Sequence, residues 1–346
     1  SGNKTQVLQI YYGYEQQTGT AGKEQHVRAD KRKVVIVGTG MVGMSYAYCL
    51  LNQSVCDELV LIDVNKKRAE GEAMDLNHGL AFANSSMTIY AGEYDDCSDA
   101  DIVVICAGVA QKQGETRLDL LKRNAEVFRS IIEPVTSSGF NGLFLVATNP
   151  VDIMTYVFTK ISGLPENQIL GSGTILDSAR LRCGLSEHFQ IAQSNIHAYV
   201  FGEHGDTSFI PWSGAYISGV SVDEYYDLEK KLGKDIEPID KEAMLQYVQK
   251  SGGEIISKKG ATFYAVSSSV CKLCSLLVSS SESISTVSTM MHGEYGIDDV
   301  CLSTLTLVGP NGVQGKVPMR MTKAEIEQLK KSADALKEII AQIDLN

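Results

Sequence analysis

Two short runs in the middle of the chain hold side chains suited to moving a proton beside a bound anion. Residues 202–206 read Gly-Glu-His-Gly-Asp and contain His204. Asp177 and Arg180 stand three apart in a helix-like run, so they share one helical face. Histidine exchanges a proton near neutral pH, a neighbouring carboxylate raises its pKa, and arginine binds a carboxylate through two parallel hydrogen bonds. We therefore expect His204 to be the acid/base, Asp177 its partner and Arg180 the anion clamp.

A second arginine closes the polar segment 111–117, which reads Gln-Lys-Gln-Gly-Glu-Thr-Arg and follows an apolar run ending at Ala107. In a doubly wound sheet, ligands bind at the carboxyl ends of the strands, so a loop here lies over the ligand crevice. If the loop closes on a substrate, Arg117 can polarise a carbonyl and help to exclude water.

Spacing alone leaves plainer interpretations open for all of these residues. A loop histidine often has no role, and an Asp–Arg pair three residues apart is often only an ion pair. Arg117 also fits the start of a helix.

A glycine-rich turn indicates a nucleotide site. Residues 34–43 read Val-Val-Ile-Val-Gly-Thr-Gly-Met-Val-Gly, a strand that runs into G-x-G-x-x-G and then a helix. Gly38 permits the tight turn, Gly40 lets the backbone approach a pyrophosphate, and Gly43 allows close helix–strand packing. Met41 and Val42 open the helix, whose first N–H groups face the anion. A glycine turn without function is the alternative.

Asp63 ends the next strand and selects the nucleotide. A carboxylate there accepts hydrogen bonds from the ribose hydroxyls and repels a 2′-phosphate, which favours NAD over NADP, unless Asp63 is only a strand-end residue. A hydride delivered to a ketone leaves negative charge on oxygen, so an acid such as His204 must supply a proton.

The order of apolar runs predicts an α/β protein with a Rossmann-type doubly wound parallel sheet, followed by an α+β substrate or catalytic domain. Strands are expected at 33–38, 59–63, 87–90, 102–107 and 143–147, and helices at 41–51, 66–83 and 117–137. Later helices are expected at 151–162, 175–188, 240–257 and 261–279, with strands near 196–200, 285–290 and 300–308. Thr322 and Glu325 form a capping box that opens a final helix. We divide the chain into an arm at 1–30, a nucleotide-binding domain at 31–150 and a catalytic domain at 151–346.

Composition excludes several classes of function. The net charge is −11 across 346 residues, which argues against binding to nucleic acid or an anionic membrane. No apolar stretch is long enough to span a bilayer, and the N-terminal segment lacks the pattern of a secretory signal. The eight cysteines fall in apolar patterns, so we expect free thiols in a reducing cytoplasm. Cys271 and Cys274 fit a core helix better than a metal site, and no metal is expected.

These motifs resemble the L-lactate/malate dehydrogenase family in order and spacing from about residue 32 onward. The runs that carry the resemblance are the glycine turn, 107–109, 114–117, 148–152, 171–173, 177–180 and 202–206. The resemblance implies His204 and Asp177 as the proton-transfer pair, with Arg117 polarising the carbonyl and Arg180 holding the carboxylate. It further implies substrate contacts from Asn149 and Thr262. Cofactor contacts are implied from Ala107, Gly108, Asn149 and Ser172, with Ser172 at the nicotinamide.

Gln111 distinguishes the branches of this family. Malate dehydrogenases carry an arginine at the equivalent position to neutralise the second carboxylate of oxaloacetate. The neutral Gln111 would leave that carboxylate unpaired in a desolvated pocket, which favours pyruvate and the lactate dehydrogenase branch. Malate or another 2-keto acid dehydrogenase is the nearest alternative, and a non-catalytic NAD-binding structural protein is a more distant one.

The resemblance also implies a homotetramer and a possible effector. Arg182 and His197 match positions that bind the phosphates of fructose 1,6-bisphosphate between subunits in many bacterial relatives. The alternative is a surface arginine and an interior strand histidine.

Overall fold

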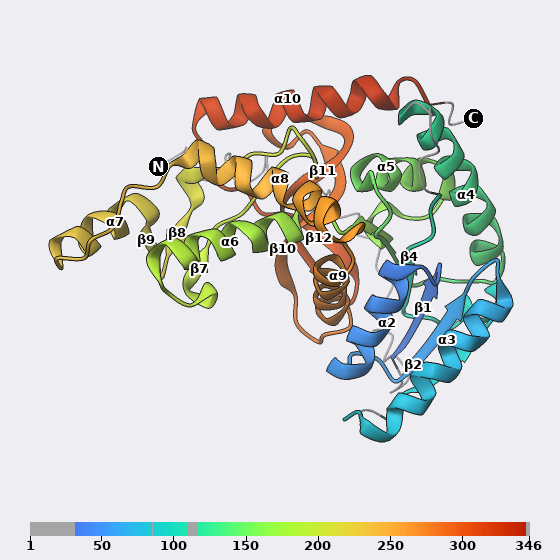
Figure 1. Cartoon of the computed structure of the whole chain (residues 1–346). Coiled ribbons are helices and arrows are strands. Elements are labelled where there is room, and N and C mark those ends of the chain that lie inside the picture. Colours follow the sequence, from blue (N-terminus) through green and yellow to red (C-terminus); the bar gives the residue numbers. More distant parts are fainter. Residues whose placement is uncertain (1–31, 85, 110–116, 344–346) are drawn as a thin grey trace, which may run out of the picture.

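Short β-branched runs form the centre of a mixed sheet in the computed structural model, which describes residues 32–84, 86–109 and 117–343 (Figure 1). The arm at 1–30 and Gln111 lie outside these residues. Six parallel strands make up one side of the sheet: β1 (Lys33–Val37), β2 (Glu58–Ile62), β3 (Thr88–Ala91), β4 (Ile102–Ile105), β5 (Leu143–Val146) and β6 (Ile169–Gly171). Their order, β3-β2-β1-β4-β5-β6, reverses direction at β1 and confirms the expected doubly wound fold. The three-residue strand β6 was not expected.

Successive side chains of each strand point to opposite faces of the sheet, and a different set of helices packs on each face. Val34 and Ile36 of β1 pack in one apolar cluster with α2 (Met41–Gln53), α3 (Lys66–Gly79) and α9 (Tyr264–Leu277). Val35 and Val37 pack in the opposite cluster with α4 (Arg117–Ser137), α5 (Val151–Ser162) and α10 (Lys323–Ile340). Since neighbouring residues of a strand point to opposite faces, a continuous apolar run needs a cover on both sides.

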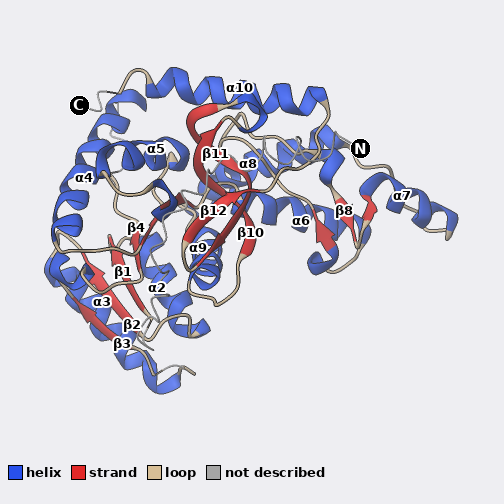
Figure 2. Cartoon of the chain, turned by 180° about the vertical axis from the view of Figure 1, so that it is seen from behind, coloured by secondary structure: helices blue, strands red, loops and turns tan. Residues whose placement is uncertain are grey.

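The sheet continues beyond β6 as an antiparallel meander (Figure 2). Its strands are β10 (Ser283–His292), β11 (Asp298–Gly309) and β12 (Gly312–Lys316). Ser288 of β10 opposes Gly171 of β6, so the sheet crosses the boundary expected at residue 150. Sequence analysis predicted β10 and β11 but missed β12.

A third apolar cluster lies beside this sheet. It joins α6 (Ile175–Phe189) and α8 (Lys241–Lys259) to a small sheet of β7 (Ile196–His197), β8 (Tyr216–Ile217) and β9 (Val220–Ser221). The short helix α7 (Val222–Lys231) follows β9 and, like this small sheet, was largely unexpected. The strand predicted over 196–200 ends at His197, because Phe201 and Gly202 pair with Phe209 and Ser303 instead.

The predictions for the start of the final helix and for the cysteines are confirmed. Both hydrogen bonds of the Thr322–Glu325 capping box open α10. All eight cysteines are free, and Cys271 and Cys274 are buried in α9. Of the helices described, none combines the length and apolarity needed to cross a membrane. Within the same residues, no cluster of histidine, cysteine or carboxylate side chains could hold a metal ion.

Candidate active site

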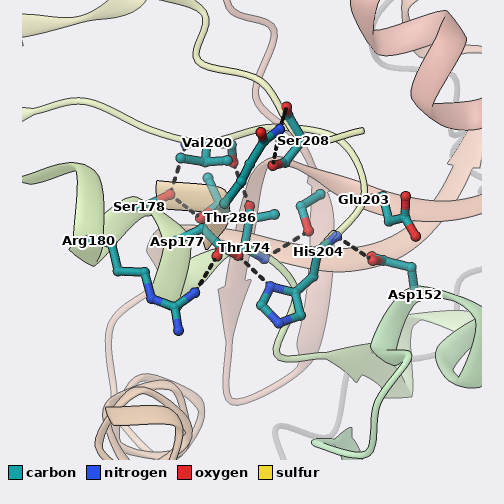
Figure 3. Close-up of polar contacts among 12 residues, drawn as sticks. Asp152, Thr174, Asp177, Ser178, Arg180, Val200, Glu203, His204, Ser208 and Thr286 are labelled. Carbon is teal, nitrogen blue, oxygen red and sulfur yellow. Dashed lines mark hydrogen bonds and ion pairs between the residues drawn. The ribbon is translucent and has the colours of Figure 1, made fainter. Parts of the chain in front are cut away.

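His204, Asp177 and Arg180 come together as one hydrogen-bonded group (Figure 3). Asp177 lies in the first turn of α6, and Arg180 follows one turn later. His204 Nδ1 donates to Asp177 Oδ2 at 2.5 Å, and Arg180 Nη1 donates to Asp177 Oδ1 at 2.9 Å. Because the carboxylate orients Nδ1 as the donor, His204 Nε2 remains the nitrogen that can exchange a proton with a substrate.

Backbone pairing positions His204. Gly202 exchanges hydrogen bonds with Ser303 of β11 at 3.0 Å in both directions, which ties the segment to the main sheet. Gly202 has φ +92°, and a Cβ there would lie 2.7 Å from Ser332 Oγ of α10. Only glycine fits this conformation and this close approach.

Burial makes the charges in this group interdependent. The side chain of Asp177 is 6% exposed and that of His204 24% exposed. Burial lowers the pKa of His204, but attraction to Asp177 and their hydrogen bond outweigh it, so the pKa lies above its ordinary value. Burial raises the pKa of Asp177, but His204 and Arg180 lower it further, so the carboxylate stays ionised.

Asp152 joins this hydrogen-bonded group, although it was not among the residues predicted from the sequence. It lies in the first turn of α5, is 2% exposed, and its Oδ2 accepts the backbone N–H of His204 at 2.7 Å. Burial raises its pKa to about 6, although the N–H of His204 acts in the opposite direction. The available signal was its place just after β5, where a parallel strand delivers side chains to the ligand edge of the sheet.

Helix α8 supports the same loop from the other side. Gln249 Nε2 donates to the carbonyl oxygens of Asp206 at 3.1 Å and Ser208 at 2.9 Å. A Cβ at Gly252 would lie 3.5 Å from Arg180 Nη2, so the missing side chain leaves room beside the guanidinium. Neither residue was predicted, because their partners are distant in sequence.

The glycine turn has the shape expected of a pyrophosphate cradle. A Cβ on Gly38, where φ is +104°, would lie 2.5 Å from Ala107 N, and one on Gly43 would lie 2.0 Å from Gly38 O. A Cβ on Gly40 would have no neighbour within 4 Å, so open space adjoins the N-terminus of α2 at Met41 and Val42. This combination of close packing and open space fits a dinucleotide.

Asp63 lies beside this turn at the end of β2. Its Oδ2 accepts from Thr39 N at 2.8 Å and Thr39 Oγ1 at 2.9 Å, and its Oδ1 accepts from Asn65 N at 2.9 Å. Burial raises its pKa, but these hydrogen bonds lower it more, so the carboxyl is held ionised beside the glycine turn.

The remaining predicted residues follow neighbouring strands. Ala107 and Gly108 follow β4, Asn149 follows β5, and Ser172 follows β6. Parallel strands bring these positions to one edge of the sheet. Thr262 lies between α8 and α9. Arg117 is the first residue of α4, but its side chain lies outside what the structure describes.

The two residues of the expected effector site lie on adjacent elements. Arg182 is half-buried on α6, and His197 is exposed on β7. The exposure of His197 excludes the alternative of an interior strand histidine.

Replacing Asp177 tests the electrostatic coupling directly. Asp177→Asn keeps a hydrogen-bond acceptor but removes the charge, so we expect the pKa of His204 to fall by about one unit or more. The Arg180→Gln control should move the pKa upward, because Arg180 lowers it in the intact protein. NMR titration of the His204 ring measures both shifts, and an unchanged pKa in Asp177→Asn would contradict the coupling.

Comparisons with known proteins agree with this geometry. Residues 32–171 match the family model of the lactate/malate dehydrogenase NAD binding domain, and residues 174–344 match its alpha/beta C-terminal domain. The chain is 47% identical over 309 residues to L-lactate dehydrogenase 1 of Peribacillus psychrosaccharolyticus, covering 89% of this chain and 96% of the relative. It is 48% identical over 309 residues to L-lactate dehydrogenase of Bacillus pumilus (strain SAFR-032), and the match covers 89% of this chain and 97% of that relative. The crystal structure of MGS-M5, a lactate dehydrogenase from a Medee basin deep-sea metagenome library, matches with a TM-score of 0.87 and 44% identity, covering 90% of this chain and 98% of that one. The chain belongs to the lactate/malate dehydrogenase family.

Proposed function

We propose that this chain is an NAD-dependent L-lactate dehydrogenase in which His204 exchanges the proton and Arg180 holds the substrate carboxylate. The observation that carries the proposal is the shared Asp177 carboxylate, which binds both side chains through its two oxygens. A 2-keto acid needs these two functions side by side: an anion clamp for its carboxylate and a proton donor for its carbonyl oxygen.

The roles of the residues follow from their positions. Bound NADH supplies the hydride. Gly38, Gly40 and Gly43 hold the pyrophosphate at the N-terminus of α2, and Asp63 binds the ribose hydroxyls. Arg180 fixes pyruvate by its carboxylate, and His204 Nε2 gives its proton to the carbonyl oxygen. The positive charge that His204 carries before this step is stabilised by Asp177.

Other predicted contacts complete the site in this proposal. Arg117 polarises the carbonyl, Asn149 and Thr262 contact the substrate, and Ser172 contacts the nicotinamide. Ala107 and Gly108 line the cofactor crevice where β4 ends.

Replacing His204 should separate chemistry from cofactor binding. We expect His204→Asn to lower kcat for pyruvate by about a hundredfold to ten-thousandfold, because the variant lacks the imidazole that is proposed to supply the proton. NADH binding, followed by fluorescence titration, should be nearly unchanged. His78→Asn on the exposed side of α3 is the control. Turnover at the wild-type rate in His204→Asn would refute the role.

Gln111 is the proposed determinant of substrate choice. We expect Gln111→Arg to raise kcat/KM for oxaloacetate relative to pyruvate by about two orders of magnitude, because the arginine pairs the second carboxylate. Gln113→Arg adds the same charge two residues away and serves as the control. A wild-type preference for oxaloacetate would instead favour malate dehydrogenase, and absence of NADH oxidation with any 2-keto acid would favour a structural protein.

We further propose a cytoplasmic homotetramer. Large apolar side chains are exposed on helices of the described chain, including Met41 and Tyr48 of α2, Ile256 of α8 and Tyr264 of α9. Exposed apolar side chains on adjacent elements are typical of subunit interfaces. Arg182 supplies a guanidinium and His197 an exposed imidazole, and both can donate hydrogen bonds to the phosphates of a sugar bisphosphate at such an interface.

The effector proposal is tested by activity and sedimentation measured with and without fructose 1,6-bisphosphate. We expect a tetramer whose KM for pyruvate falls severalfold when the effector binds, because the phosphates neutralise paired cationic groups. The double variant Arg182→Gln, His197→Asn should remain tetrameric and lose the activation. A wild-type enzyme indifferent to the sugar bisphosphate overturns the effector site, and a monomer overturns the assembly.

A further inference from the structure

A second polar site lies on the far part of the main sheet, between η3 (Glu166–Gln168) and strands β10 and β12. It is a hollow with about 40 Å³ of open space, more than one water molecule requires. Lys316 lines it together with Thr289, and three ionisable side chains, Glu166, His292 and Glu294, complete its polar lining. None of these residues belongs to the proposed active site.

Strand register directs Lys316 into the sheet. On β12, Lys316 opposes Thr306 and Gly315 opposes Leu307, but Val313 opposes Val308, so Gln314 is an extra residue in a bulge. Without this bulge the alternation of side chains would be shifted by one, and Lys316 would lie on the opposite face. With it, Lys316 shares a face with the buried hydroxyls of Thr306 and, across β11, Thr289.

The amine of Lys316 has hydroxyl partners instead of a carboxylate. Its Nζ donates to Thr289 Oγ1 and, at 3.3 Å, to Thr306 Oγ1. Among the described residues it forms no ion pair, whereas Lys33, also on this sheet, pairs with both Glu58 and Asp99. A desolvated ammonium with only neutral partners is costly, so the neutral amine is favoured there.

Burial lowers the pKa of Lys316 to about 8, against the weaker opposing attractions of Glu294, Cys301 and Asp152. Glu294 faces it from the turn after β10, Cys301 from β11 and Asp152 from α5. Lowering the pKa from its ordinary value makes the neutral amine more than a hundredfold (roughly) more abundant near pH 7.5. A neutral lysine amine is a nucleophile.

We infer that this hollow is a modification site in which Lys316 reacts, as a neutral amine, with small uncharged carbonyl compounds. The amine nitrogen adds to the carbonyl carbon, the resulting carbinolamine loses water, and an imine remains on the Nζ atom. The proton released by the ammonium beforehand goes to solvent. The carboxylate of Glu294 at the hollow disfavours anionic reagents, so uncharged aldehydes should enter more readily than keto acids. The carboxylate of Glu166 contributes less, because it lies 2.8 Å from His292 Nε2.

The experiment uses the whole protein and formaldehyde with cyanoborohydride, which reduces each imine to a stable methylamine that peptide mass spectrometry locates. Labelling rates are measured between pH 6 and pH 10 for Lys316 and for Lys272, which is exposed on α9. We expect the rate at Lys316 to level off above about pH 8, where its amine is already neutral, while the rate at Lys272 continues to rise.

Two variants and two further reagents sharpen the test. Lys316→Met should lose this label without loss of the label at Lys272. Thr289→Val removes a hydroxyl that accepts a hydrogen bond from the ammonium, so the pKa of Lys316 should fall. The labelling rate of Lys316 should then level off at a lower pH. Glyoxylate should label Lys316 at least severalfold more slowly, relative to Lys272, than acetaldehyde does. The wild-type pH profile needs no variant, so a folding defect cannot obscure it. An unlabelled Lys316, or one whose rate rises in parallel with Lys272, overturns the inference.

Discussion

The buried Asp177 carboxylate is the interaction on which the proposed chemistry depends. One oxygen accepts from His204 and the other from Arg180, so a single side chain sets the tautomer of the acid and the position of the clamp. Burial by itself would neutralise such a carboxyl, but its two cationic partners keep it ionised. The three groups are therefore stable only together: removal of either cation would leave a poorly compensated charge in the interior.

The main sheet provides the rigid support for this group. Gly202 pairs with Ser303 on β11, and Asp152, just after β5, accepts the N–H of His204. The residues proposed to bind the nucleotide follow β1, β2, β4, β5 and β6 at one edge of the same sheet. Because β6 joins the parallel strands to the antiparallel meander, the residues proposed for cofactor binding and those proposed for proton transfer are positioned by one continuous hydrogen-bonded structure.

In the antiparallel part of the sheet, a single extra residue in β12 decides which groups surround the Lys316 amine. The bulge at Gln314 directs Lys316 toward buried hydroxyls, where its ammonium forms no ion pair with any described residue. The same lysine on the opposite face would have different neighbours. The reactivity inferred for it is therefore a property of strand register, not of residue type.

Much of the fold and of the proposed site follows from local sequence. The β-branched runs need cover on both faces, Gly38 and Gly43 occupy positions where a Cβ would collide with backbone, and Thr322 and Glu325 cap α10 through neighbouring groups. These features depend on residues close together in the chain, so their pattern is visible without a structure. The same holds for Asp177 and Arg180, which share a helical face.

Tertiary structure alone decided the contacts between distant segments. Asp152 accepts a hydrogen bond from His204, which lies 52 residues away in the sequence, and Gln249 donates one to Asp206, which lies 43 residues away. Sequence spacing cannot reveal such contacts, because they depend on which strands pair and how helices pack over them. Burial is decided in the same way: it raises the pKa of Asp152 and lowers that of Lys316, and neither shift exists until the chain has excluded water from both groups.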